Sequence, residues 1–380
     1  MALLTLSTTL TVAVVALTVW LLRRKRRQPR DSLMELAAGL QGACVPAELE
    51  EQITRVAKKR ALGGQPPSQA DELAMLDASP VPRFELEDPG WLEHLDREGY
   101  AVVASVASPG EIAHAKDLLW NFLETATACR RDLPETWSDE ECQRVGNVRT
   151  GFVNQAGIGQ SDFMWYIRTL PRVRGAFERI WGTMSLLVSF DGANIFRPWH
   201  HGFRKTICGW WHVDQGAAKQ GRHSVQGLVS LLLADATTGG LTVLPKSHLR
   251  HAEVTQDMAN PSKDYCRVDH YEPVVRESVR RLVSCQPGDL LLWDSRTVHA
   301  NSPAPRQPTT PAGQLLREVA YVCMTPKCWA SLDARRRRRT AYEQGVTCAH
   351  WPHELAQDLL GGGCKHSLAE APPEVVDLVG

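Results

Sequence analysis

The sequence predicts a mainly β fold, a sandwich or barrel with flanking helices, preceded by one membrane-spanning helix. Apolar runs such as 226–233 and 290–293 are separated by the turn signals Gly239-Gly240 and Pro287-Gly288, as expected for short buried strands. Amphipathic stretches at 91–99 and 111–129 come before these runs and predict helices that pack outside the β structure. Residues 2–22 form an uncharged, mostly apolar run.

Four segments follow from these patterns. We expect a membrane anchor with a basic flank at 1–27, a helical and linker spacer at 28–88, the β domain with its N-terminal helices at 89–330, and a helical or irregular C-terminal extension at 331–380. A chain of 380 residues has room for one large domain with extensions. Its formal net charge is zero, so we expect no nucleic-acid partner.

The apolar run 2–22 is long enough to cross a bilayer as a helix, and the wholly basic residues 23–27 follow it. A secretory signal would carry its basic residues before the apolar stretch and a small-residue cleavage site after it. We therefore predict an uncleaved single-pass anchor, with the following domain in the cytoplasm. A cleaved segment that targets an organelle is the alternative. The ten cysteines are scattered, which suits a reducing compartment.

The spacer has helical patterning at 33–40 and 46–62, and breaks at 63–68 and 77–82. Ser108, followed by Pro109 and with Glu111 three positions later, predicts the start of the helix at 111–129.

Three residues could form a metal site. On a strand, His212 and Asp214 would project from the same face, because residues i and i+2 do so. His299 ends a second strand-like run. Two imidazoles and one carboxylate match the face that non-haem iron(II) oxygenases use. The other His-x-Asp pair, His94 and Asp96, falls on a predicted helix where i and i+2 diverge, so we expect both to be solvated surface groups.

Arg317 lies in the strand-like run 315–324, where its side chain would share a face with apolar residues. An unpaired buried charge is costly, so this arginine needs an anionic partner. A planar guanidinium is suited to a carboxylate.

Taken together, these motifs resemble the phytanoyl-CoA dioxygenase family. The resemblance rests on His212-x-Asp214, Gly239-Gly-Leu-Thr-Val-Leu-Pro-Lys-Ser-His248, Trp293-Asp-Ser-Arg-Thr-Val-His299 and Arg317, and it covers roughly residues 90 to 330. It implies a double-stranded β-helix, or jelly roll, and an oxidoreductase that depends on iron(II), 2-oxoglutarate and O2, with ascorbate as a reductant.

Position by position, the resemblance implies that His212, Asp214 and His299 ligate iron and that Arg317 pairs with the distal carboxylate of 2-oxoglutarate. Arg306, in a proline-rich loop, is a rival for that role. The acid at Asp214 disfavours a halogenase, which needs this position vacated for chloride.

Several other side chains have two interpretations. Gln226 and Thr242 flank the predicted ligand strand and would face the cosubstrate or make structural hydrogen bonds. Ser295 would contact the cosubstrate or only end a strand. The remaining ambiguous groups are His200 and His201 (turn or pocket), Trp210, Trp211 and Trp293 (core or pocket lining), His350 and His353 (ordered loop or second metal), and the basic run 335–339 (solvated helix, or a site for phosphate, membrane or localisation).

The expected activity is hydroxylation of a small organic substrate with release of succinate and CO2, and the anchor favours a lipid-like substrate. A protein hydroxylase on the same fold is an alternative. A catalytically silent jelly roll that binds a ligand or partner is another. A cupin-like metal enzyme without 2-oxoglutarate would have no use for Arg317.

Overall fold

The computed structural model describes residues 47–258, 260–348, 350–355 and 366–380, and it divides into two compact units, residues 1–62 and 63–380. In the first unit, α3 (Ala47–Gly63) confirms the helix expected at 46–62. The predicted anchor, its basic flank and the helix expected at 33–40 lie outside the described residues. Among the helices that are described, none has the length and apolar character needed to cross a membrane.

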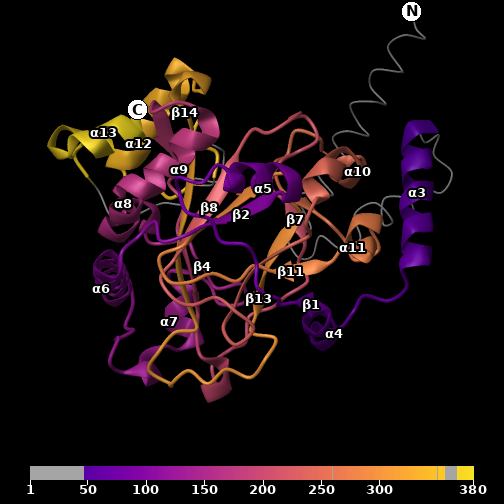
Figure 1. The fold of residues 1–380 in the computed structure, drawn as a ribbon, viewed down its shortest axis with the longest axis horizontal. Coiled ribbons are helices and arrows are strands. Elements are labelled where there is room, and N and C mark those ends of the chain that lie inside the picture. The colour runs from indigo at the N-terminus through magenta and orange to yellow at the C-terminus, as the bar shows by residue number, and fades with distance from the viewer. Residues whose placement is uncertain (1–46, 259, 349, 356–365) are drawn as a thin grey trace, which may run out of the picture. The chain divides into compact units, whose positions relative to one another are not determined.

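The second unit contains two β-sheets (Figure 1). The larger sheet has the order β2 (Tyr100–Val103), β12 (Leu290–Asp294), β8 (Val225–Ser230), β14 (Arg317–Pro326), β6 (Ala193–Phe196), β4 (Phe152–Val153) and β3 (Gly146–Asn147), with β5 (Leu186–Val188) also paired to β14. The smaller sheet has the order β1 (Leu76–Asp77), β11 (Arg280–Leu282), β9 (Gly239–Val243), β13 (His299–Pro303), β7 (His212–Val213) and β10 (Cys266–Arg267).

The chain alternates between the sheets through most of its strands. From β6 it passes to β7 in the smaller sheet, back to β8, on to β9, and later from β12 through β13 to β14. Within each sheet, the strands of this part of the chain that pair with one another are antiparallel. The winding is that of a jelly roll, so the mainly β core predicted from the sequence is confirmed.

The two sheets bury a shared apolar core. Leu228 and Leu291 project into it from the larger sheet, and Leu241 and Val243 project from the smaller one. Apolar side chains interdigitate in this way when two sheets pack face to face. The alternation of side chains along each strand therefore fixes which residues face the interior.

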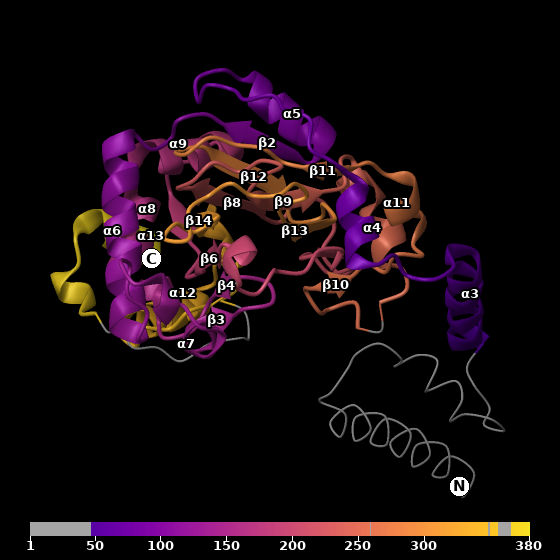
Figure 2. The ribbon, with the colours of Figure 1, turned by 90° about the horizontal axis from the view of Figure 1, so that it is seen from below.

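Helices cover the outer faces of both sheets (Figure 2). Those packed on the larger sheet are α6 (Pro109–Ala126), α8 (Asp162–Thr169), α9 (Pro171–Trp181), α12 (Leu332–Glu343) and α13 (Pro373–Val379). The short helices α10 (His251–Thr255) and α11 (Pro273–Glu277) cover the smaller sheet. Helix α6 begins at the predicted capping box, in which Ser108 and Glu111 exchange hydrogen bonds.

Other elements refine the predictions. Helix α5 (Gly90–Glu98) confirms the helix expected at 91–99, and α7 (Asp139–Gln143) is an additional short helix. Part of the expected spacer belongs to the folded unit, because α4 (Gln69–Ala74) lies there and β1 pairs in parallel with β11. The described cysteines are free thiols.

Candidate functional site

The predicted metal ligands meet in the smaller sheet. His212 opens β7 and His299 opens β13, and the two are opposite each other in antiparallel register. Asp214 follows β7, where its backbone N–H donates to the carbonyl of Ser295 at 3.1 Å. The Nε2 atoms of His212 and His299 lie 3.6 Å and 3.1 Å from the Asp214 carboxylate. All three side chains are buried, with their donor atoms within 4.8 Å of one another.

Hydrogen bonds orient both imidazoles toward the centre of this triad. Nδ1 of His212 donates to the carbonyl of Trp210 at 3.2 Å, and Nδ1 of His299 donates to that of Thr297 at 3.0 Å. A carbonyl can only accept, so the proton sits on Nδ1 and the Nε2 lone pair is left for a metal.

The protonation states also suit a cation. Burial lowers the pKa of His212 to about 3, so its imidazole is neutral. Burial alone would raise the pKa of Asp214, but the groups around it, His350 first among them, outweigh burial and hold that pKa well below its ordinary value. Neutral imidazoles and an ionised carboxylate are the forms that bind a divalent metal.

Arg317 is buried with an incomplete set of partners. Its Nη2 donates to Asn301 Oδ1 at 3.4 Å, and its guanidinium carbon lies 5.2 Å from the centre of the Phe196 ring. Nε has no hydrogen-bond partner among the described residues. Burial lowers the pKa of Arg317 against the opposing influence of the Tyr321 hydroxyl, and no described carboxylate contributes to that pKa. This orphaned donor fits an incoming carboxylate, whereas the rival Arg306 is exposed on a loop.

The three residues proposed to face the cosubstrate have different partners. Gln226 Nε2 donates to Asp214 Oδ2 at 2.7 Å, so Gln226 belongs to the site. The Ser295 hydroxyl donates to Gln215 Oε1 at 2.8 Å. The Thr242 hydroxyl donates to the carbonyl of Ala300 at 2.9 Å, a structural bond within the sheet. Direct contact with the cosubstrate stays a prediction for all three.

Aromatic rings flank the triad. Trp210 is half-buried and stacks on His212, with ring centres 4.9 Å apart and planes 10° apart. Tyr265 lies 5.0 Å from the same imidazole. Trp211 is buried in the core, and Trp293 is buried with its ring centre 5.4 Å from that of His299. Sequence reasoning missed Tyr265, because this residue follows no recognisable motif.

Asn301 was missed as well, although a signal was available. It follows His299 by two positions on β13, so strand alternation places both on one face.

The remaining histidines have other surroundings. His200 and His201 both contact the Thr310 carbonyl, and His353 contacts the Thr325 hydroxyl. In the described part of the chain, the triad is the group of His, Cys, Asp or Glu side chains whose ligand atoms lie close enough together to hold a metal ion. The prediction that His94 is solvated is wrong, because its ring packs beside Phe84 and Tyr100.

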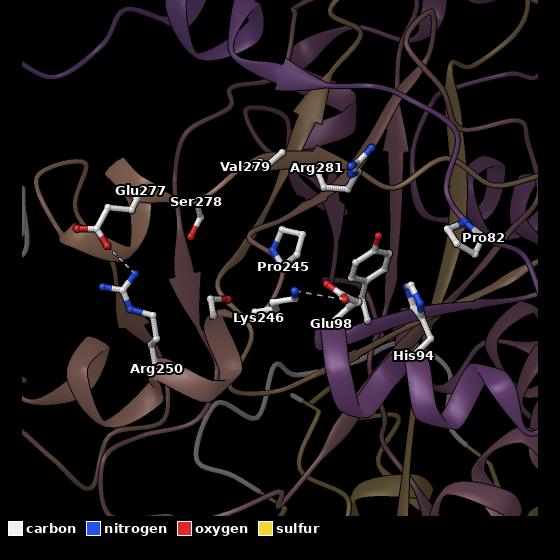
Figure 3. A pocket seen from close by; sticks show the side chains of 12 residues that line it. Pro82, His94, Glu98, Pro245, Lys246, Arg250, Glu277, Ser278, Val279 and Arg281 are labelled. Atoms are coloured by element: carbon white, nitrogen blue, oxygen red, sulfur yellow. Dashed lines mark hydrogen bonds and ion pairs between the residues drawn. The ribbon is translucent and has the colours of Figure 1, made fainter.

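A hollow of about 580 Å³ lies elsewhere, between α5, the turn at 245–250 and the start of β11 (Figure 3). No residue of the triad lines it. Its cations are already paired: Lys246 with Glu98, Arg250 with Glu277, and Arg281 with Asp77. These pairs leave no unbalanced charge for a ligand.

A buried face of two imidazoles and one carboxylate, held on a jelly roll, defines the class of non-haem iron oxygenases. A family model described as phytanoyl-CoA dioxygenase matches residues 95–305, more than half of the sequence. The chain belongs to the phytanoyl-CoA dioxygenase family and is a 2-oxoglutarate-dependent non-haem iron oxygenase.

Similar proteins include the Ava biosynthesis cluster protein O of Aspergillus versicolor, 27% identical over 286 residues that cover 71% of this chain and 88% of that protein. Among solved structures, the α-ketoglutarate-dependent carbocyclase SnoK from nogalamycin biosynthesis is 17% identical, with a TM-score of 0.45 and coverage of 65% and 87%. EctD from S. alaskensis, solved with 2-oxoglutarate and 5-hydroxyectoine, is 15% identical, with a TM-score of 0.42 and coverage of 64% and 77%.

Proposed function

We propose that His212, Asp214 and His299 hold iron(II), that Arg317 binds the distal carboxylate of 2-oxoglutarate, and that the enzyme hydroxylates a C–H bond of a small organic substrate. The observation that carries this proposal is the pairing of a metal-competent triad with a buried arginine whose Nε is orphaned. The name of the fungal relative refers to a biosynthesis cluster, which supports a small-molecule substrate.

The protein's own contribution is orientation. Carbonyls fix both imidazoles, and the Gln226 amide holds one oxygen of Asp214, so the ligand set is arranged before the metal binds. Burial of the triad excludes water from the reacting centre. When bound, iron(II) and 2-oxoglutarate would supply, with O2 as the oxidant, the oxidative decarboxylation that yields succinate and CO2.

Two finer expectations stay predictions. The anchor at 2–22, which would place the enzyme on a membrane with its domain in the cytoplasm, lies outside the described residues. The expectation of a lipid-like substrate rests on that anchor alone. No observation in the described part of the chain favours a protein hydroxylase over a small-molecule enzyme.

The test is succinate formation by the purified chain given iron(II), ascorbate, O2 and 2-oxoglutarate without a prime substrate. Slow uncoupled decarboxylation would produce succinate above background. We expect His212→Ala to abolish it, because removing one ligand weakens metal binding. His201→Ala is the matched control and should keep wild-type turnover, since His201 is exposed and contacts Thr310.

If succinate stays at background, anaerobic titration with iron(II) and 2-oxoglutarate decides between the alternatives. An absorption band that requires both components would support the proposed ligands and show that turnover is coupled to substrate. No band would refute the assignment.

A further inference from the structure

A row of aromatic rings leads from the interior to the candidate metal centre. Tyr321 on β14 stacks on Phe152 of β4 at 5.3 Å, and Phe152 meets Trp210 edge-on at 6.2 Å. Trp210 in turn stacks on His212, which lies 5.0 Å from Tyr265. Tyr321 is buried, Phe152 and Trp210 are half-buried, and Tyr265 is 46% exposed. The row therefore becomes more accessible as it passes the triad.

Tyr265 is held in a strained conformation. Its φ of 115° is a region that side-chain-bearing residues rarely adopt. The flanking residues impose it: Asp264 accepts from the Gly216 N–H at 3.1 Å and pairs with Lys219, and Cys266 pairs with Val213 in β10. Because the Tyr265 ring is partly exposed beside a metal ligand, this strained backbone conformation is not explained by packing in the core. Such strain is typical of residues that contact ligands.

The rings of Trp210 and Phe152 present apolar faces to a ligand and no free polar group. The Trp210 Nε1–H already donates to the carbonyl of Ile207 at 3.1 Å, so its polar edge is satisfied. Phe152 has no polar atom. Aromatic faces stack well against flat, apolar partners. Ligand pockets are lined mainly by hydrophobic and aromatic side chains.

We infer that Phe152, Trp210 and Tyr265 form a substrate wall beside the metal centre, and that the substrate presents a flat, apolar ring to it. The inference rests on the proposed function, because it specifies the substrate class of that same site. It commits to a ring-bearing molecule over an acyclic chain. Tyr265 is the specificity-determining residue of this wall, since it is the most exposed of the three.

The test compares 2-naphthol with 1-decanol, which share carbon number and a hydroxyl but differ in ring content. Calorimetric titration of the full chain with each probe is run anaerobically, with and without iron(II) and 2-oxoglutarate. We expect the ring probe to bind about tenfold more tightly than the acyclic one, as stacking on aromatic faces adds to apolar burial. Tyr265→Ala should lower the affinity for 2-naphthol about tenfold and should change the affinity for 1-decanol by no more than about twofold.

Three further variants separate recognition from folding. Tyr265→Phe keeps the ring and should bind naphthol like the wild type. Tyr265→Gly tolerates the positive φ, so it should fold well yet lose ring selectivity. Tyr166→Ala is the matched control, because this half-buried tyrosine contacts His114 on α6 and should change neither affinity.

Equal affinities for the two probes, or unchanged naphthol binding in Tyr265→Ala, would overturn the substrate wall. The absorption band of bound iron(II) and 2-oxoglutarate tests the cofactor site separately. An intact band without ring selectivity refutes the wall alone. Ring selectivity without the band supports the wall and refutes the proposed cofactor site.

Discussion

Arg338 and Arg317 are both buried arginines, and they differ in their partners. The guanidinium of Arg338 donates to four backbone carbonyls, those of Val188, Pro352, Leu378 and Val379. Arg317 reaches Asn301 at 3.4 Å and leaves Nε without a partner among the described residues. Burial lowers the pKa of both groups, that of Arg338 to about 10.

The comparison distinguishes an arginine that stabilises the fold from one that is available to a ligand. A buried cation whose donors are satisfied by the backbone ties elements together, here α12, α13 and β5. A buried cation with missing acceptors costs stability until a ligand supplies them. Sequence composition alone does not distinguish these two cases, because both residues are arginines in ordered elements.

The largest effect should follow Arg338→Met. Four carbonyls would lose their donor inside the protein, so the free energy of unfolding should fall by about 3–5 kcal/mol in urea denaturation. Arg336→Met, on the exposed face of the same helix, should stay within about 0.5 kcal/mol of the wild type. Equal stability of the two variants would show that Arg338 has no structural role.

Arg317→Met should leave the stability of the ligand-free protein intact and abolish its stabilisation by 2-oxoglutarate. Replacing an under-partnered charge by an apolar chain should leave stability without ligand unchanged or slightly higher. 2-Oxoglutarate at about 100 times its Kd should add about 2.7 kcal/mol to the unfolding free energy of the metal-loaded wild type. That gain should vanish in Arg317→Met and persist in Arg306→Met, as measured by thermal unfolding. A persisting gain in Arg317→Met would exclude this residue as the carboxylate partner.

The same reasoning extends to a half-buried acid, Asp191, with a smaller effect. Burial raises the pKa of Asp191 to about 6, against the opposing influence of His350 and Arg168. The folded state thus holds this proton more tightly than the unfolded one, and the stability it contributes is lost as pH rises from about 4 to about 6. Asp191→Asn removes this loss.

Between about pH 4.5 and about pH 8, Asp191→Asn should therefore gain on the order of 1–2 kcal/mol relative to the wild type in urea unfolding. Asp132→Asn, at an exposed acid, serves as the control. A constant difference between Asp191→Asn and the wild type across this range would contradict the raised pKa.

Local patterns predicted much of the fold and the site. Alternation along strands placed His212 and Asp214 on one face and Arg317 in the interior, because a two-residue period is written in the sequence itself. The capping box predicted the start of α6 for the same local reason.

What the sequence could not show depends on distant partners. The basic run 335–339 suggested a solvated helix, and α12 is helical, but Arg338 is buried because its acceptors come from residues far along the chain. His94 lies on a charged helix, yet the rings of Phe84 and Tyr100 cover it. Tyr265 takes its position from tertiary restraints on both sides, with no local pattern to indicate it.

The antiparallel register of His212 and His299 has a consequence for how the chain can vary. Residues 214–298 separate the two strands, and loops within that stretch can lengthen or shorten without moving either histidine. A single residue inserted inside β13 is different, because it would turn every later side chain to the opposite face of the strand. Asn301 would then no longer share a face with His299, and Arg317 would lose the amide that it contacts. Insertions and deletions among relatives should therefore accumulate in the loops between β7 and β13 and be nearly absent within these two strands.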